Sequence, residues 1–563
     1  MRILSRGKRT KETRGKPLDI LYIMWYKNML HFNNRILGKE EYIMFPKIAL
    51  ITPHTLSHRT AEETLALGYL ASILRANSCA VTIVDGWLRG ISSAEIVTIL
   101  EQAGKPDIIC ISCYRSNLEQ SKELLHAITE RFGIIPSICG GYGPTFHDID
   151  FLAAGFTVAV RGEAEHLIVP LVEALASDKI PLDIPGITFR DGSSIIRTQK
   201  AEPIRNLDDL AFPARDEIDF VSMRKNPAHV CTSRGCEAHC TFCSVFTFAR
   251  DGSKDHRWRH RSIQNIVDEL RLLYECHGIT HIKFVDDSFL EPPRDEKWVT
   301  DFGNTLARYN LPLRFRTQVR ADRLTESIVG GLKQAGWFAT SIGIENAAPS
   351  ALRRMGKAAS AEDNWGALEL LKRHSIYAQV GMILFDDATT PEELEINHRF
   401  LAHHDWIVTK GIFTEMFAAE GTPFTRKLSR QGLTRSDKIQ QNHRYEVRDV
   451  SARRVYQMLK TWHRSHSGLY DWVIDSITAP KVLPDVGYAS VHAVCGLVTG
   501  CDTNIFRRVL DHVVARPSDQ DKWFITEIIS EHAPFYADVW SQIQTIYDYY
   551  GLAYDGVPNP FLD

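Results

Sequence analysis

The sequence holds too few cysteines for a disulfide scaffold and no apolar run long enough to cross a membrane. Its 563 residues include eleven cysteines, and this odd number leaves at least one unpaired. No run of eighteen apolar residues occurs, and the basic N-terminus is followed only by a short mixed stretch, residues 18–30. We therefore expect a cytoplasmic protein with no membrane span and no signal peptide.

Neither sign of charge dominates the sequence. There are 66 Lys and Arg residues against 69 Asp and Glu residues, which gives a net charge of −3. A balance of this kind exerts no overall attraction on nucleic acid or on an anionic membrane, so we expect no nucleic-acid partner. The hydrophobic content of 44% is ordinary, and a chain of this length exceeds what one core usually holds. We expect two to four domains.

Residues 1–46 lack clear periodicity and form a basic N-terminal extension. Met44 stands just before a strand-like run and is a candidate for the true start of the chain. Two interpretations remain open for this extension. It is either a disordered arm or a mis-assigned upstream start, or it is an arm that covers the active site.

Residues 47–182 alternate short apolar runs with helical stretches. Strands are expected at residues 48–51, 81–84, 108–112 and 137–139, with helices at 62–75, 93–102 and 119–131. This alternation is typical of a doubly wound parallel sheet, whose ligand lies at the carboxyl ends of its strands. The candidate binding residues at those ends are Gly140, Gly141, Thr145, Gly162 and Glu163.

Three further regions follow along the chain. Residues 183–224 are rich in turn signals and suit a linker with a small hairpin. Residues 225–425 repeat about six strand and helix pairs, which indicates a partial (β/α)6 barrel with its site at the strand C-termini. Residues 426–563 are helical and aromatic, and we expect this region to cap the cavity and supply part of a substrate pocket. The fold class is α/β with a mainly helical C-terminal region.

Three thiols fall within eight residues at the start of the predicted barrel, at Cys236, Cys240 and Cys243. A short loop of thiolates can wrap around one soft metal centre. Cuboidal iron-sulfur clusters normally take four cysteines, so three leave one iron open. The alternative is a zinc site with Cys231 as fourth ligand, but zinc sites usually use two close pairs separated by a longer span. We expect Cys231 to face the barrel wall as a small apolar residue.

The spacing CxxxCxxC, with Phe242 before the last cysteine, resembles the signature of the radical S-adenosylmethionine superfamily. The resemblance implies that Cys236, Cys240 and Cys243 hold a 4Fe-4S cluster, that S-adenosylmethionine chelates the open iron, and that Phe242 packs near its adenine. It also implies that reduction of the cluster gives methionine and a 5′-deoxyadenosyl radical. An external electron donor such as flavodoxin or ferredoxin is implied as a partner.

Two later segments also resemble this family by position. Residues 284–289 contain Asp287 and are similar to the DDNF segment, with Ser288 in place of Asn, and residues 343–346 contain Glu345 and are similar to the GIES segment. The resemblance implies cofactor contacts for Asp287 and Glu345. Structural interpretations remain open, in which Asp286 and Asp287 form a solvated helix start and Glu345 caps a helix.

Over residues 47–425 the chain resembles the sub-family with a cobalamin-binding domain before the barrel. The segments 67–71, 84–86, 140–145 and 161–165 carry this resemblance, which implies that Gly140, Gly141, Thr145, Gly162 and Glu163 contact cobalamin. Two departures stand out. Gly143 occupies the usual histidine position of GGxHPT, and no DxHxxG segment supplies a lower histidine ligand. Cobalamin is then expected to bind without a histidine donor from that motif. A dinucleotide-binding or purely structural domain is the alternative, although no GxGxxG follows the first strand.

A methylthiotransferase with a second cluster is a rival within the superfamily. Cys110 and Cys113 test it, because residues three apart in a strand face opposite sides and do not readily chelate one metal. We interpret the chain as a methyltransferase acting on an unactivated centre of a small molecule or peptide. The alternatives are a radical cyclase, oxidase or ring-contraction enzyme that uses cobalamin without methyl transfer, and a non-catalytic metal-binding or sensing protein.

Overall fold

The structure is a computed structural model that describes residues 46–54, 62–179, 181–250, 257–409, 412–436, 443–470 and 481–552. The predictions for the N-terminal extension before residue 46 lie outside these residues. No helix within the described ranges is both long and apolar enough to cross a bilayer.

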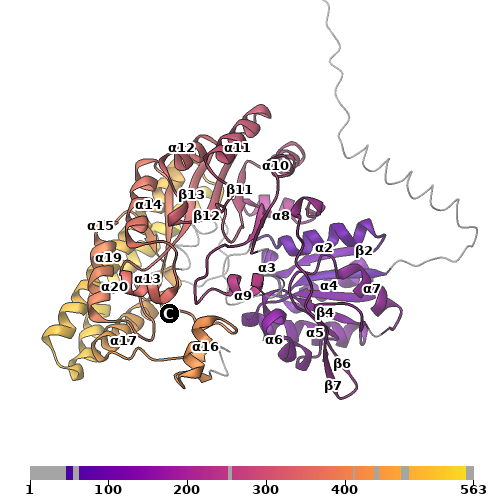
Figure 1. The fold of residues 1–563 in the computed structure, drawn as a ribbon, viewed down its shortest axis with the longest axis horizontal. Coiled ribbons are helices and arrows are strands. Elements are labelled where there is room, and N and C mark those ends of the chain that lie inside the picture. Colours follow the sequence, from indigo (N-terminus) through magenta and orange to yellow (C-terminus); the bar gives the residue numbers. More distant parts are fainter. Residues whose placement is uncertain are drawn as a thin grey trace, which may run out of the picture. The chain divides into compact units, whose positions relative to one another are not determined.

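The N-terminal domain is built on a parallel sheet whose strand order is β2-β1-β3-β4-β5. Figure 1 shows this domain in indigo and purple, with β2 and β4 labelled. Its strands are β1 (Lys47–Thr52), β2 (Ala80–Asp85), β3 (Ile108–Ser112), β4 (Ser137–Gly140) and β5 (Val158–Val160). The helices α2 (Leu65–Ala76) and α7 (Ile168–Ala176) pack on one face, and α4 (Ser93–Ala103), α5 (Leu118–Phe132) and α6 (Tyr142–Ala153) pack on the other. Because both faces are covered, the strands read as continuous apolar runs, and the doubly wound prediction is confirmed.

The predicted linker contributes to this sheet. Its hairpin, β6 (Ile187–Asp191) and β7 (Ser194–Arg197), pairs antiparallel to β5 and extends the sheet to seven strands. Asp148 of α6 accepts hydrogen bonds from Thr188 at 2.7 Å and from Arg197 at 2.6 and 2.7 Å. The hairpin therefore belongs structurally to the N-terminal domain. Short helices α3 (Gly86–Arg89) and α8 (Ile218–Met223) complete this part of the chain.

The second sheet has six parallel strands in the order β8-β11-β12-β13-β14-β15, which confirms the partial (β/α)6 barrel. The strands are β8 (Ala228–Val230), β11 (His281–Phe284), β12 (Arg314–Arg320), β13 (Trp337–Glu345), β14 (Tyr377–Met382) and β15 (Val408–Thr409). The helices are α10 (Ile263–His277), α11 (Glu296–Arg308), α12 (Glu326–Gln334), α13 (Pro349–Met355), α14 (Ala361–Arg373) and α15 (Pro391–His403). Helix α12 was not predicted, because Gly330 and Gly331 lower its helical propensity. A Cβ at Gly331 would lie 2.7 Å from Val299 of α11, so close packing requires glycine there.

The cysteine loop and the C-terminal region contain the remaining elements. A two-stranded ribbon, β9 (Ser233–Gly235) and β10 (Trp258–His260), flanks the loop, which leads into α9 (Ser244–Arg250). After the barrel come α16 (Pro423–Arg430), the short pair β16 (Arg435–Ser436) and β17 (His443–Arg444), α17 (Val450–Ser465), α19 (Asp485–Ala515) and α20 (Asp521–Tyr550). The predicted helical character of residues 426–563 is confirmed for the described residues.

The C-terminal helix α19 begins at the N-terminal end of the barrel, opposite the expected mouth. Tyr488 packs on Phe338 and His281, at ring-centroid distances of 5.0 and 6.5 Å, and His492 packs on Tyr377 at 4.7 Å. These partners lie at the beginnings of strands β13, β11 and β14. None of the described residues after 425 lines the cavity described below. The expectation that this region caps the cavity and supplies part of the pocket is therefore not met by the described residues.

Buried ion pairs join the N-terminal domain to the barrel. Glu163, after β5, binds Arg259 of β10 through two contacts of 2.7 and 2.9 Å and lies 3.3 Å from Arg234 of β9. Arg234 also pairs with Glu165. A second bridge runs from Glu63 through Arg215 to Glu269 of α10, with both pairs at 2.7 Å and every side chain less than 8% exposed. These charges fix how the two domains meet, because each one is buried and needs its partner.

We predict that Glu163→Gln lowers the free energy of unfolding by about 3 kcal/mol at pH 7, since it leaves Arg259 buried with a weakened partner. Burial opposes ionisation of Glu163, but Arg259 and Arg234 outweigh it and lower its pKa to about 2. A depressed pKa stabilises the folded state above the unfolded pKa, and that contribution is lost as pH falls toward the folded pKa. The difference between the two proteins should therefore narrow between about pH 5 and pH 2.

Urea unfolding monitored across this pH range tests the prediction. Glu130→Gln, which removes an exposed partner of His126, is the matched control and should leave the midpoint unchanged. Equal midpoints for Glu163→Gln and Glu130→Gln at pH 7 would show that the buried pair does not hold the domains together.

Candidate functional site

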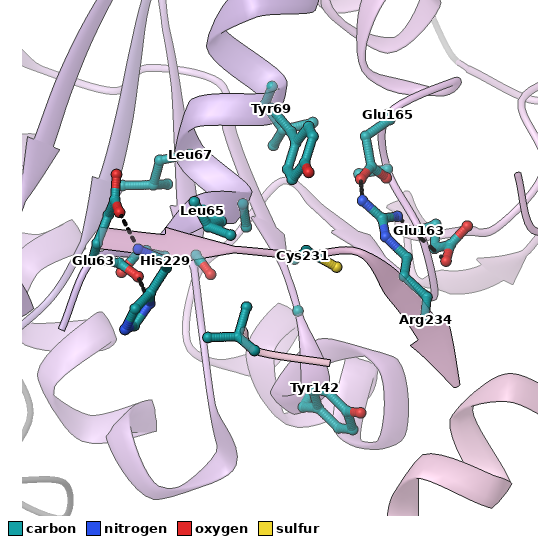
Figure 2. A pocket seen from close by; sticks show the side chains of 18 of the residues that line it. Glu63, Leu65, Leu67, Tyr69, Tyr142, Glu163, Glu165, His229, Cys231 and Arg234 are labelled. Carbon is teal, nitrogen blue, oxygen red and sulfur yellow. Dashed lines mark hydrogen bonds and ion pairs between the residues drawn. The ribbon is translucent and has the colours of Figure 1, made fainter. Parts of the chain in front are cut away.

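A cavity of about 610 Å³ lies at the carboxyl ends of the N-terminal strands and is also lined by strands of the barrel. Figure 2 shows Tyr69, Tyr142 and Glu163 of the N-terminal domain around it with His229 and Cys231 of the barrel. The predicted site residues that line it are Gly140, Gly141, Gly162, Glu163 and Asp287. Those that do not are Thr145, Phe242, Glu345, Cys236, Cys240 and Cys243. The cavity sits where ligands bind in open α/β sheets.

Glycines form the wall of the cavity at the ends of β4 and β5. Gly141 has a φ of +100°, and a Cβ there would lie 2.9 Å from the Cys113 carbonyl oxygen. Gly162 has a φ of +89°, and a Cβ there would meet no atom within 4 Å. Thr145 joins the two loops, because its hydroxyl donates to the Gly141 carbonyl at 2.7 Å and accepts the Gly162 N–H at 3.0 Å. The glycines leave space that a bulky ligand can use, whereas Thr145 positions the loops.

Gly143, the departure from the histidine motif, has a packing reason. A Cβ at this position would lie 2.8 Å from the ring of Phe151 and 2.8 Å from the Tyr114 backbone. A histidine therefore does not fit without moving the backbone. Among the described residues of the N-terminal domain, none that lines the cavity is a histidine.

Aromatic side chains that sequence reasoning did not select also line the cavity. Tyr142 stacks on Phe248 of α9 at 4.8 Å and on Tyr114 at 6.5 Å, and Trp87 meets Tyr114 edge to face at 6.4 Å. All four line the cavity. Tyr114 lies in a loop, Trp87 and Tyr142 lie at helix starts, and Phe248 lies within the short helix α9, so no periodicity marks them as important. Tyr114 and Tyr142 each follow the end of a strand, and this position could have indicated a place at the cavity. For Phe248 the sequence offers no such signal, and only the fold shows that it packs on Tyr142.

The three loop cysteines are held in surroundings that suit metal-bound thiolates. The Ala238 N–H points to the Cys236 sulfur at 3.4 Å, and Cys243 lies at the start of α9 beside the N–H groups of Val245 and Phe246. Burial raises the pKa of Cys236 to about 12 and that of Cys240 to about 11. These thiols would stay protonated by themselves at neutral pH, so the positive charge of a metal centre is what would favour their thiolate forms. The donor set fits an iron-sulfur cluster.

The zinc alternative does not agree with the geometry. Among the residues that the structure describes, only Glu369, His403 and His404 offer three ligand atoms close enough for a single ion. Thiolates of a cuboidal cluster bind different irons and so lie farther apart than ligands of one ion. Cys231 lines the cavity and donates to the Ser233 carbonyl at 3.2 Å, so the expectation that it faces the barrel wall was wrong. Its position after β8 turns its side chain to the inner face of the barrel.

The other candidate cluster cysteines lie on opposite faces of the N-terminal sheet. Cys110 belongs to the apolar core beneath α2 and α7, whereas Cys113 belongs to the core beneath α4 and α5. Burial raises the pKa of each thiol to about 12. This arrangement agrees with the prediction that the two do not share a second cluster.

The two acidic residues after β11 have different surroundings. Asp286 is buried, accepts from the Thr232 N–H at 2.6 Å and lies 3.5 Å from Arg294. Asp287 lines the cavity and accepts the Gly235 N–H at 3.0 Å, beside the cysteine loop. Burial raises the pKa of Asp287 to about 6; the Gly235 hydrogen bond lowers this pKa, and the neighbouring Asp286 raises it by a smaller amount. The interpretation of this segment as a solvated helix start was wrong.

Glu345 ends β13 in a left-handed backbone conformation, with a φ of +64°. Lys357 contacts its carboxylate at 3.3 Å and the Gly343 carbonyl at 2.9 Å. The Glu345 carboxylate folds back against Gly343, where a Cβ would lie 2.6 Å from it. Phe242 packs partly buried against the cluster that contains Met355 of α13. The cofactor contacts expected of Glu345 and Phe242 remain predictions.

Two domain families match this chain. Residues 56–172 match the B12 binding domain, and residues 230–401 match the radical SAM superfamily. The chain is 26% identical over 365 residues to the uncharacterized methyltransferase PH0819 of Pyrococcus horikoshii, covering 63% of this chain and 77% of that protein. It is 28% identical over 319 residues to the anaerobic magnesium-protoporphyrin IX monomethyl ester cyclase of Cereibacter sphaeroides, covering 54% of this chain and 50% of the relative.

The fold is also that of a solved enzyme. The cobalamin-dependent S-adenosylmethionine radical enzyme OxsB, in a structure with aqua-cobalamin and S-adenosylmethionine bound, superposes with a TM-score of 0.71. The match covers 90% of this chain and 80% of OxsB at 19% identity, so it bears on the fold alone. With both domain families in the order that the sequence predicts, this chain belongs to the cobalamin-dependent radical S-adenosylmethionine enzymes, whose cofactors are a 4Fe-4S cluster, S-adenosylmethionine and cobalamin.

Proposed function

We propose that this enzyme transfers a methyl group from S-adenosylmethionine to an unactivated centre of a small molecule or peptide. The observation that carries the proposal is the single cavity lined by strand ends of both domains. Gly140 and Gly162 lie on its N-terminal wall, and Gly235, next to Cys236, lies on its barrel wall. A substrate in this cavity would be within reach of both cofactor sites. The similarity to a protein named as a methyltransferase supports the same reaction.

On the barrel side, Cys236, Cys240 and Cys243 would supply the three thiolates of the cluster and leave one iron open for S-adenosylmethionine. Phe242 and Glu345 are the residues that we propose to position S-adenosylmethionine, and Lys357 holds the Glu345 carboxylate in place. When bound, these groups supply an organic radical and a transferable methyl group. The protein's contribution is to place them around one substrate and to keep water out.

On the N-terminal side, the glycine wall would let cobalamin approach the backbone closely. We propose that Gly140, Gly141, Gly162 and the Thr145-linked loops form this contact, and that no histidine of the described N-terminal lining binds cobalt. Glu163 holds the domains together through Arg259, so its proposed role in cobalamin binding is to position the loop. Tyr142 of the N-terminal domain stacks on Phe248 of α9, and both side chains line the cavity.

A second candidate is radical chemistry without methyl transfer, such as cyclisation. The similarity to the Cereibacter sphaeroides cyclase favours it, although the match covers only half of that protein. Both candidates need an electron for the cluster. We propose that an external donor such as a flavodoxin or ferredoxin supplies it.

The first prediction concerns the fate of the methyl group. Anaerobic turnover with methyl-labelled S-adenosylmethionine and candidate extracts should place the label in a product, read by mass spectrometry. Formation of 5′-deoxyadenosine with no label in any product would contradict methyl transfer and support the second candidate.

The second prediction concerns the cluster ligands. Cys236→Ala, Cys240→Ala and Cys243→Ala should each abolish iron binding, because each thiolate is one of three anchors, while the reconstituted wild type binds about four irons. Cys231→Ala is the matched control, since its thiol faces the cavity but bonds to Ser233. Iron content and the cluster absorption measure the result. Equal iron loss in Cys231→Ala would refute the assignment.

The third prediction concerns cobalamin. Gly140→Val should remove most cobalamin binding, because Gly140 lines the cavity and a Cβ there meets only Val160, at 3.9 Å. This position avoids the strain that positive φ would add at Gly141 or Gly162. Gly366→Val on α14, where a Cβ meets nothing, is the control and should bind cobalamin normally. Cobalamin retained per chain after gel filtration, with the iron content unchanged, measures the effect. Full retention of cobalamin by Gly140→Val would show that cobalamin binds at a different part of the protein.

A further inference from the structure

Two helices on the outside of the barrel bring two histidines and a glutamate to one point. Glu369 is on α14, His403 is the last residue of α15, and His404 follows it directly. Figure 1 shows α14 and α15 side by side, in agreement with the packing of Trp365 of α14 on both histidine rings, at centroid distances of 4.7 and 4.6 Å. None of the three residues lines the cavity between the strand ends. This cluster is therefore separate from that cavity.

The distances within the cluster suit a single metal ion. His403 Nε2 lies 3.4 Å from Glu369 Oε1, and His404 Nδ1 lies 3.8 Å from the same oxygen. All three ligand atoms are within 4.8 Å of one another. Two ligands that each lie about 2.1 Å from a tetrahedral zinc ion are separated from each other by about 3.4 Å. The three atoms are thus close to the positions that they would take around one ion.

The backbone at the end of α15 makes this convergence possible. Consecutive side chains of a regular helix point about 100° apart and rarely meet at one point. The chain leaves the helix at His404, whose φ and ψ are −100° and 52°. The rings of His403 and His404 then lie 4.8 Å apart, on the side that faces Glu369.

His404 provides the independent sign that a ligand belongs here. Its side chain is fully buried, and within the described ranges neither ring nitrogen has a hydrogen-bond partner. Phe400 and Trp365 pack on the ring at 4.7 and 4.6 Å, which accounts for the burial of its carbon atoms but leaves the nitrogens unsatisfied. A buried polar group without a partner costs free energy. A metal ion bound to Nδ1, the nitrogen nearer to Glu369, would remove part of this cost.

The contact between His404 and Glu369 is not an ion pair at neutral pH. Burial, with a smaller effect of His403, lowers the pKa of His404 to about 4, so its ring is uncharged and keeps a lone pair for a metal. The other two side chains are open to solvent, with 56% of His403 and 49% of Glu369 exposed. An ion can therefore enter from outside, and water can complete its coordination.

We propose that Glu369, His403 and His404 bind one divalent transition-metal ion of the zinc class. Two imidazoles and one carboxylate, with water in the remaining position, are a donor set that zinc uses in proteins. The ligands come from α14 and from the end of α15, so the ion holds these two helices together just before the chain enters β15. This inference does not depend on methyl transfer.

Zinc is the probe for the test. The full chain, loaded with cluster and cobalamin and freed of any affinity tag, is dialysed to equilibrium with radioactive zinc. One saturable site is expected. His403→Gln and Glu369→Gln should each weaken zinc binding about tenfold or more, since each removes one of three protein ligands. Both side chains are about half exposed, so these variants should keep the fold and the iron content of the unaltered chain.

His126→Gln is the matched control. His126 lies 3.3 Å from Glu130 in an exposed pair, and no third ligand joins them among the described residues. Zinc binding should be unchanged in this variant. Zinc should also raise the Tm of the unaltered chain and of His126→Gln, but not that of His403→Gln, because an ion that binds only the folded state stabilises it.

X-ray absorption at the zinc edge identifies the ligands. We expect nitrogen and oxygen neighbours at about 2.0–2.1 Å and no sulfur at about 2.3 Å, which separates this site from the cysteine loop. No saturable zinc binding, a sulfur neighbour, or equal zinc binding by His403→Gln and the unaltered chain would overturn the inference.

Discussion

The arrangement of this enzyme depends on buried charges that must find their partners across a domain boundary. Glu163 meets Arg259, and Glu63 meets Arg215, which in turn meets Glu269. Breaking such a pair costs more than the pair gains, because the remaining charge stays buried. The pairs therefore contribute little net stability. Their main effect is to restrict how the two domains can pack against each other. They allow the two domains to meet in one way, and the cavity lined by both cofactor domains is the consequence.

The barrel itself is layered along its axis. Aromatic contacts between α19 and the strand beginnings close one end, Lys283 and Arg316 lie farther along β11 and β12, and the Glu345 carboxylate lies against Gly343 and Gly381. The C-terminal helices thus contribute from beneath the site.

Local signals were sufficient for most of the elements and for the family. The alternation of apolar runs with helices gave both sheets, because buried parallel strands and amphipathic helices leave different periodicities. The spacing of Cys236, Cys240 and Cys243 marked the cluster loop without any knowledge of distant contacts. These features depend on neighbours in the chain, and a sequence displays them directly.

Features that depend on distant contacts were not available from the sequence. Glu163 was expected to touch cobalamin, yet its two oxygens bind Arg259, nearly a hundred residues away. Lys283 and Arg316 read as ordinary polar positions of strands, and only closure of the barrel places them side by side. The inward direction of Cys231 and the docking of α19 at the strand beginnings were not predicted for the same reason, since the direction of a strand face and the docking site of a helix are set by tertiary packing.

The central claim is that the two cofactor sites are held in one fixed geometry around a shared cavity. The dipolar coupling between the reduced 4Fe-4S cluster and Co(II) cobalamin, measured by pulsed electron paramagnetic resonance, tests it directly. We expect a single narrow distance distribution in the full chain, and a broadened one when Arg259→Met removes the partner of Glu163. A broad distribution in the unaltered enzyme, or one that Arg259→Met leaves unchanged, would contradict the account.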